Sequence, residues 1–261
     1  MQAHLLTALA LVSSLVISAH AQVVRDLGSF GGPENMAADL SRDGAVVVGY
    51  SYDPQLHPYA FRWTAATGMQ SVGNLGGTGP FSGAYANAVS ADGDVVVGDS
   101  DIPAGPSHAF RWRAGVGLQD LGTLGGDNSS AKDVSADGNV VVGFSVDTAG
   151  AMRAFRWTPQ GGMLDLGTLG GSRAFANGVS ADGNVVVGFA RNAAGHDRAF
   201  RWTAASGMTD LGTLGGNESS AAAVNADGTV VVGSAKDAAG RSRAFRWTQA
   251  TGLVPLPDLV V

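Results

Sequence analysis

Three sequence motifs that follow one another along the chain decide the fold, and we refer to them and their copies as phrases: Val179-Ser-Ala-Asp-Gly-Asn-Val-Val-Val-Gly188, Arg198-Ala-Phe-Arg-Trp202 and Asp210-Leu-Gly-Thr-Leu-Gly-Gly216. The Asp-Gly pair predicts a hairpin turn, because glycine accepts a positive φ. The Val-Val-Val-Gly run predicts a strand that is covered on both faces. With the segments around them, these phrases give four short β-rich stretches separated by turn signals.

This unit occurs five times. Arg-Trp, which contains every tryptophan of the chain, recurs with steps of 49, 45, 45 and 45 residues, and Asp-Gly recurs with the same steps. Four strands in about 45 residues are typical of a β-propeller blade. We therefore predict an all-β propeller of about five four-stranded blades over residues 22–261. A stacked solenoid, whose coils are usually shorter, is the alternative.

The composition agrees with an all-β chain. The helix formers lysine and glutamate occur only at Lys132, Lys236, Glu34 and Glu218, whereas 39 of the 261 residues are glycine. The net charge is −6 and there is no basic run, which speaks against a nucleic-acid partner. The chain has no cysteine, which excludes disulfides, thiolate metal sites and a cysteine nucleophile.

Residues 1–21 are predicted to be a secretory signal peptide. An apolar stretch from Leu5 to Ser18 precedes Ala19-His20-Ala21, a small-x-small cleavage pattern. The stretch is short for a spanning helix, and a membrane anchor or a misplaced start codon is the alternative. We expect a secreted, periplasmic or cell-surface protein with no stable membrane insertion after signal cleavage.

Several phrases resemble a known family. His108-Ala-Phe-Arg-Trp112, Asp120-Leu-Gly-Thr-Leu-Gly-Gly126 and the Val179–Gly188 phrase are similar to the HAF repeat of bacterial extracellular repeat proteins. The resemblance covers residues 23–257, although His-Ala-Phe itself occurs once. The order of these motifs within one repeat also resembles that of the WD40 blade, although the Gly-His and Trp-Asp dipeptides of that family are missing here. Membership implies a secreted or surface-exposed bacterial protein and brings no reaction or catalytic residues.

Residues present in every copy are predicted to hold the fold. Alternation along the strand places Phe200 and Trp202 on one face, in an aromatic core between blades, and Arg201 on the other. A buried arginine requires a partner, and a four-residue hairpin loop places Arg201 opposite Asp210. The same count places Arg62 opposite Ser71 and Arg246 opposite Pro255. The predicted structural residues are Arg62, Arg111, Arg156, Arg201, Arg246, Trp63, Trp112, Trp157, Trp202, Trp247, Asp26, Asp120, Asp165 and Asp210.

The ring is predicted to close through the N-terminus. Residues 23–30 are a sixth copy of the fourth strand and contain the aspartate, as Asp26, whereas the last copy has Pro255 in its place. A last blade that took its fourth strand from residues 23–30 would pair Asp26 with Arg246 and cover an open sheet edge. An open arc, or a larger ring made by two chains, is the alternative.

Binding is predicted on the face that carries the variable loops. The loops between the second and third strands differ most among the copies, and residues 77–85 contain the one insertion. Exposed aromatic and acidic side chains there suit a glycan or a protein partner; aromatics that only cover the blade edges are the alternative. The candidate binding residues are Tyr50, Tyr52, Tyr59, Phe81, Tyr85, Asp99 and Asp101.

The sequence contains no signature of catalysis. There is no Gly-x-Ser-x-Gly elbow, and His57, His108 and His196 belong to different copies, which speaks against a shared metal site. We predict a secreted or surface non-catalytic repeat scaffold, without metal or cofactor, that binds an extracellular protein or glycan through one loop face. A hydrolase or lyase that acts on extracellular polysaccharide is the alternative.

Overall fold

The protein, seen in a computed structural model, is described over residues 25–79, 82–103 and 105–257. These ranges contain twenty strands in five four-stranded antiparallel sheets, each built from consecutive strands. We call the sheets blades 1 to 5. The predicted signal peptide, residues 1–21, lies outside the described residues.

The strand bounds are as follows: β1 Asn35–Leu40, β2 Val46–Tyr52, β3 Pro58–Thr64, β4 Gly68–Ser71; β5 Ala84–Val89, β6 Val95–Asp101, β7 Ser107–Arg113, β8 Gly117–Asp120; β9 Gly125–Val134, β10 Val141–Asp147, β11 Met152–Thr158, β12 Gly162–Asp165; β13 Gly170–Val179, β14 Val186–Asn192, β15 Asp197–Thr203, β16 Gly207–Asp210; β17 Gly215–Val224, β18 Val230–Asp237, β19 Ser242–Thr248, β20 Gly252–Pro255.

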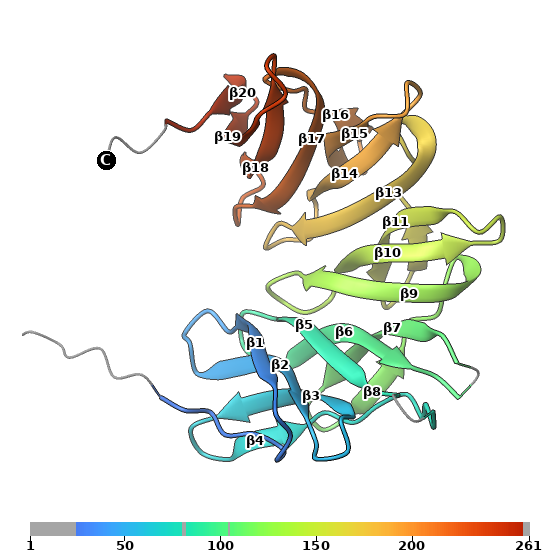
Figure 1. Cartoon of the computed structure of the whole chain (residues 1–261), viewed down its shortest axis with the longest axis vertical. Helices are drawn as coiled ribbons and strands as arrows, with labels where there is room; N and C mark the ends of the chain where they lie inside the picture. The colour runs from blue at the N-terminus through green and yellow to red at the C-terminus, as the bar shows by residue number, and fades with distance from the viewer. Residues whose placement is uncertain (1–24, 80–81, 104, 258–261) are drawn as a thin grey trace, which may run out of the picture.

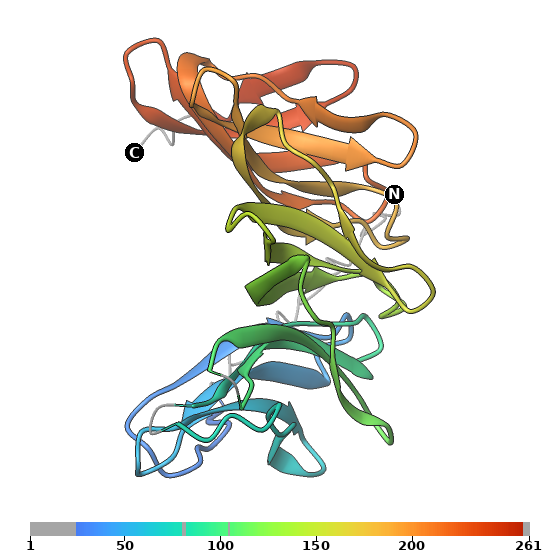
Figure 2. The same cartoon turned by 90° about the vertical axis from the view of Figure 1, so that its right-hand side faces the viewer.

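The blades follow one another along an arc, with blade 1 at one end and blade 5 at the other (Figures 1 and 2). The first strands of successive blades contact one another, from β1 with β5 to β13 with β17. The predicted all-β architecture of four-stranded blades is thus confirmed. Among the described residues, no sheet pairing joins blade 5 to blade 1.

The valine runs and the Asp-Gly turns form as the sequence predicts. Val96, Val97, Val186 and Val187 are fully buried on second strands. Before each second strand, the Asp-Gly turn has its glycine at positive φ, for example +72° at Gly183. The turn therefore needs glycine for its backbone conformation.

The predicted register of the third hairpin in each blade is wrong by one residue. Phe200 pairs with Asp210, and Arg201 pairs with Thr209. The loop has three residues instead of four, because Gly207 adopts a φ of +65° and pairs with Thr203. The side chains of Arg201 and Asp210 are therefore not opposite each other.

The predicted closure through the N-terminus is also wrong. The outer strand of blade 5 is β20, in which Pro255 pairs with Phe245. A proline is tolerated there because β20 is an edge strand. Asp26 accepts a hydrogen bond from the Gly28 N–H (2.9 Å) instead of meeting Arg246.

The N-terminal segment lies on blade 1. The Phe30 N–H donates to Ser51 Oγ (3.0 Å), the Gly32 N–H donates to the Tyr52 carbonyl (2.9 Å), and the Arg25 guanidinium lies 4.8 Å from the Trp63 ring centroid. Two of the four repeat counterparts of Phe30 make the same bond to the following blade, Leu75 to Ser100 (2.9 Å) and Leu124 to Ser145 (2.8 Å). The surplus copy is therefore used as a linker that binds the blade after it.

Candidate functional site

Three of the predicted binding residues meet between blades 1 and 2. Tyr50 and Tyr52 lie on β2, and Tyr85 lies on β5. The Tyr50 ring centroid is 5.0 Å from that of Tyr85 and 5.9 Å from that of Tyr52, both edge-on. Burial and the hydrogen bond with Tyr52 raise the pKa of Tyr85, so its hydroxyl is protonated at neutral pH. The three tyrosines form a half-buried cluster.

The predicted placement of these tyrosines among variable loops is wrong. Strand β2 continues to Tyr52 and β3 begins at Pro58, which leaves residues 53–57 as the loop. Tyr59 lies apart from the cluster, edge-on to Phe30 with ring centroids 5.9 Å apart. Phe81 lies outside the described residues.

The two candidate aspartates are occupied by hydrogen bonds. Asp99 Oδ1 accepts from Ser130 Oγ (2.6 Å) and from Asn87 Nδ2 (3.1 Å). Asp101 accepts from Ser107 Oγ (2.5 Å) and from the Gly83 N–H (3.1 Å). The bond to Ser130 crosses from blade 2 to blade 3, so Asp99 contributes to the contact between two blades.

Sequence reasoning missed a second aromatic group. Phe144 lies 5.1 Å from Phe175, and Phe175 lies 4.9 Å from Phe189, between ring centroids. Phe144 and Phe189 are the repeat counterparts of Tyr50, and Phe175 is the counterpart of Tyr85. A comparison of this one position across the copies could have found the group.

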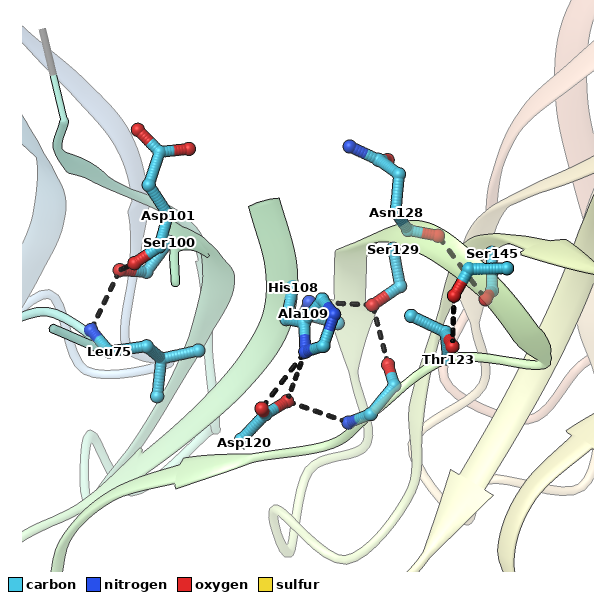
Figure 3. A network of polar contacts seen from close by, with 12 residues as sticks. Leu75, Ser100, Asp101, His108, Ala109, Asp120, Thr123, Asn128, Ser129 and Ser145 are labelled. Atoms are coloured by element: carbon cyan, nitrogen blue, oxygen red, sulfur yellow. Dashed lines mark hydrogen bonds and ion pairs between the residues drawn. The ribbon is translucent and has the colours of Figure 1, made fainter. Parts of the chain in front are cut away.

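The predicted Arg–Asp pairs of the repeats do not form, and the aspartates make other contacts. Asp120 contacts His108 Nδ1 (2.9 Å) and accepts from the Gly122 N–H (2.7 Å) (Figure 3). Asp210 accepts from the Gly212 N–H (2.8 Å) and is 3.1 Å from Arg198 Nε. Each of these aspartates closes a local Asx-type turn after the fourth strand.

A serine links the turn to the next blade at two of the four linkers, and Ala84 and Ala174 stand at the equivalent positions of the other two. In Figure 3, Ser129 Oγ donates to the Gly122 carbonyl (2.6 Å) and accepts from the Ala109 N–H (2.8 Å), which joins β9 to β7. Ser219 repeats both contacts between blades 4 and 5, with Gly212 (2.6 Å) and Ala199 (2.9 Å). These bonds fix the linkers between blades 2 and 3 and between blades 4 and 5.

The arginine in each of the first four Arg-Trp pairs binds the following blade. Its guanidinium donates to the carbonyl of the glycine in the next Asp-Gly turn. Burial lowers the pKa of Arg111 and Arg156, but an arginine stays charged at any physiological pH. The bonds are Arg62 to Gly93 (2.9 Å), Arg111 to Gly138 (2.9 Å), Arg156 to Gly183 (3.0 Å) and Arg201 to Gly228 (3.4 Å).

A backbone ladder runs beside these arginines. The residue before each of the first four Asp-Gly turns donates its N–H to the carbonyl of its counterpart in the next blade. The bonds are Arg42 to Ala91 (3.1 Å), Ala91 to Ala136 (3.1 Å), Ala136 to Ala181 (3.0 Å) and Ala181 to Ala226 (3.0 Å). Every blade-to-blade contact is therefore built on the same two hydrogen bonds.

A third bond alternates along the arc. Asp39 accepts from the Val89 N–H (2.9 Å) and Asp133 accepts from the Val179 N–H (2.8 Å). In the even blades an asparagine donates instead, as Asn177 does to the Ala221 carbonyl (2.8 Å). Burial raises the pKa of Asp133 to about 6, with a smaller contribution from the charge of Asp39.

Apolar packing completes each contact between blades, which we call a joint. Phe200 and Trp202 pack against Val140, Val142 and Leu166 of the preceding blade, which confirms the predicted inter-blade aromatic core. The turn glycine fits closely against a valine: a Cβ on Gly183 would lie 2.3 Å from Val140 Cγ2. The glycine is thus required by both its φ and its neighbour.

The joint is incomplete at the two ends of the arc. Leu40 of blade 1 is 59% exposed, whereas its counterpart Val89 is 7% exposed; Val232 of blade 5 is 39% exposed, whereas Val187 is fully buried. Arg246 is exposed, and no hydrogen bond of its guanidinium to another described residue is found. We call the two surfaces the end faces.

A metal site would need several His, Asp or Glu side chains close together in the part of the chain that the structure describes. No group of three or more His, Asp or Glu side chains that could hold a metal ion occurs there. His57 contacts Asp53 (3.1 Å), and His108 contacts Asp120. Within the same residues, no helix is long and apolar enough to cross a membrane.

The sequence matches no family model and no curated protein. The structure is similar to TolB from Acinetobacter baumannii, with a TM-score of 0.58 and 16% identity over 84% of this chain and 53% of that chain. A putative TolB from Agrobacterium tumefaciens gives 0.58 and 16%, over 87% and 81%. Prolyl oligopeptidase B from Galerina marginata gives 0.58 and 10%, over 84% and 33%.

These similarities place the chain in the β-propeller class and, at such low identity, show the fold alone. The chain spans about half of the first TolB and one third of the oligopeptidase. The same fold occurs in a peptidase as well as in TolB, which contradicts the predicted function as a non-catalytic scaffold that binds through one loop face. The similarities support the alternative, a polysaccharide hydrolase or lyase, no better.

Proposed function

We propose that the protein is exported and acts by assembly: its end faces dock onto a further propeller-type blade of a protein partner outside the cytoplasm. The observation that carries this proposal is the incomplete joint. Four joints repeat the same hydrogen bonds and the same apolar packing, and the pattern stops at blades 1 and 5 with apolar side chains exposed.

Export is supported by the predicted signal peptide and by the resemblance to the HAF repeat. Both come from the sequence. The proposal assigns no reaction to the chain, since the sequence offers no nucleophile elbow, and it differs from binding through the variable loops because the working surfaces are blade faces.

The test measures whether the end faces are covered in native material, by which we mean an unfractionated extract that still contains the protein's natural partners. The chain has no cysteine, so Leu40→Cys and Val232→Cys each introduce a unique thiol on an end face. We expect maleimide to label both thiols rapidly in the dilute purified protein and at least about tenfold more slowly in unfractionated native material, because a docked face excludes solvent.

The control is Val116→Cys, in the turn between β7 and β8 of blade 2, which is 78% exposed and is not part of either end face. Its thiol should react equally fast in both samples. Equal labelling of all three thiols in native material would overturn the proposal.

A further inference from the structure

We propose that the partner is a second copy of this chain, bound head to tail, with blade 5 of one copy against blade 1 of the next. This inference rests on the proposed function and names the occupant of its end faces. The template is the joint that the chain already makes four times between its own blades.

The two end faces carry complementary halves of the hydrogen bonds. On blade 5, the Arg246 guanidinium is the counterpart of Arg201, and the Ala226 N–H is the counterpart of the Ala181 N–H. On blade 1, the carbonyls of Gly44 and Arg42 are the counterparts of the two acceptors, Gly228 and Ala226. Among the described residues, the two donors on blade 5 have no acceptor of this kind, and the two carbonyls on blade 1 have no donor of this kind.

The apolar parts also match. In the joint between blades 4 and 5, Val185 and Val187 pack against Val231 and Phe245. Blade 5 presents Val230 and Val232 in the same positions, and blade 1 presents Val47, the counterpart of Val231, together with the exposed Leu40. Phe61, the counterpart of Phe245, is already buried within its own chain at 1% exposure, so on this side Leu40 and Val47 provide the apolar contact.

Space for the contact exists on both sides. A hollow of about 430 Å³ lies beside Arg246, lined by Arg201, Val230 and Trp247 among others. On blade 1, a Cβ on Gly44 would meet only Leu40 Cδ1, at 3.9 Å, whereas a Cβ on Gly228 would lie 2.5 Å from Val185 Cγ2. The position at which Val230 of a second copy would pack against Gly44 is therefore open.

Two features make this joint weaker than the internal ones. Blade 5 has Ala222 and Ala223 where earlier blades have the bonding Asn177 or Asp133. Leu256 and Leu27 are both repeat counterparts of Leu211, so in the new joint they would occupy the same position. The residues after β20 in one copy must therefore move aside for residues 25–30 of the copy whose blade 1 is bound. We therefore expect an association that depends on protein concentration.

The contact joins two different surfaces, so it is heterologous. Such a contact closes into a ring if its rotation allows and otherwise continues as an open chain. Two copies would give ten blades, more than the four to eight that are typical of closed propellers. We expect open chains of copies.

The first experiment is disulfide trapping. Arg42→Cys in one sample and Ala226→Cys in another place thiols at the two halves of the backbone ladder; after mixing and mild oxidation, we expect a covalent dimer well above the level that each variant gives alone. Ala136→Cys with Ala181→Cys in one chain is the geometric control, since those backbones are bonded at 3.0 Å.

A chain that carries both Arg42→Cys and Ala226→Cys separates the outcomes. A ladder of linked species supports the proposal, whereas a cross-linked monomer shows closure within one chain and overturns it. No link in either sample, with the geometric control linked, also overturns it.

The second experiment needs no thiol. Sedimentation velocity of the unmodified protein should show association that Gly44→Ala weakens at least about tenfold, because the new Cβ fills the position that Val230 would take. A monomer at every concentration, together with slow labelling of the end faces in native material, would mean that the partner is another protein: the inference falls and the proposed function stands. Rapid labelling there as well would remove both.

Discussion

The joint between blades 3 and 4 and the outer face of blade 5 use the same repeat residues, yet they differ in burial and bonding. Arg156 donates to Gly183 in the joint, whereas Arg246 is exposed on the end face. Val142 is fully buried, whereas its counterpart Val232 is 39% exposed. The difference shows that a blade obtains much of its core from its neighbour.

Internal joints should therefore contain most of the stabilising contacts. A four-stranded sheet buries one face only when another layer covers it, and in repeat arrays stability is a sum of unit and interface contributions. Matched substitutions at a joint and at an end face measure the interface contribution directly.

The largest expected effect comes from filling a turn glycine. Gly183→Ala places a Cβ 2.3 Å from Val140 Cγ2 and forces alanine into a φ of +72°. We expect the free energy of unfolding to fall by about 2–5 kcal/mol, from overpacking together with left-handed strain. Urea unfolding followed by tryptophan fluorescence measures it.

The matched control for that substitution is Gly44→Ala. Its φ is +71°, but its Cβ would have only Leu40 within 4 Å. The loss should be limited to the strain, about 1–2 kcal/mol. Equal losses at the two positions would mean that inter-blade packing contributes little at this glycine.

The next effect comes from the arginine that crosses the joint. Arg156→Met keeps the length of the side chain and removes the bond to the Gly183 carbonyl (3.0 Å). We expect a loss of about 2–3 kcal/mol, as for a bond with a charged donor. Arg246→Met should change the stability of the dilute protein by less than about 0.5 kcal/mol.

These two arginines also separate stability from assembly. Arg246→Met should weaken association in sedimentation velocity while the unfolding midpoint of the monomer stays the same. A loss of monomer stability as large as that of Arg156→Met would show that Arg246 already has a partner within its own chain.

The sequence predicts the blades well because each depends on local pattern. The valine runs, the Asp-Gly turns and the Phe–Trp face all follow from strand alternation and turn chemistry, and they form as expected. The register of the third hairpin does not follow, because loop length depends on the left-handed Gly207, and one residue changes the partner of Arg201.

The partners of the arginines and the position of residues 25–30 depend on neighbouring blades. Alternation within one blade cannot show that Arg201 donates to Gly228, 27 residues further along the chain. The pattern of residues 23–30, with Asp26, predicts a fourth strand for the last blade, whereas the counterparts of Leu27 to Phe30 act as linkers between blades. The sequence predicts Tyr50, Tyr52 and Tyr85 as neighbours on loops, and they do contact one another, but on strands β2 and β5.

The smallest expected effect among the substitutions at an internal joint concerns Asp133, a partly buried acid of the joint between blades 3 and 4. The pKa of Asp133 is raised to about 6 from 3.8, chiefly by burial. The folded protein therefore keeps a proton that the unfolded chain has released, and stability decreases as the pH rises from about 4 through about 6.

Asp133→Asn should remove this dependence. Asparagine can still accept the Val179 N–H through its amide oxygen, so the variant should gain about 1–2 kcal/mol relative to the original protein between about pH 4.5 and pH 8. The measurement is urea unfolding at several pH values.

The control is Asp237→Asn in blade 5: hydrogen bonds with the Arg241 and Ala239 backbone and the Arg241 side chain lower the pKa of Asp237 to about 2. Asp237 is ionised in both states above about pH 4.5, so the effect of its substitution should be constant across that range. If the effect of Asp133→Asn on the free energy of unfolding were also constant across this pH range, the carboxylate of Asp133 would be charged in the folded joint. Enough solvent would then reach it for it to titrate like an exposed acid.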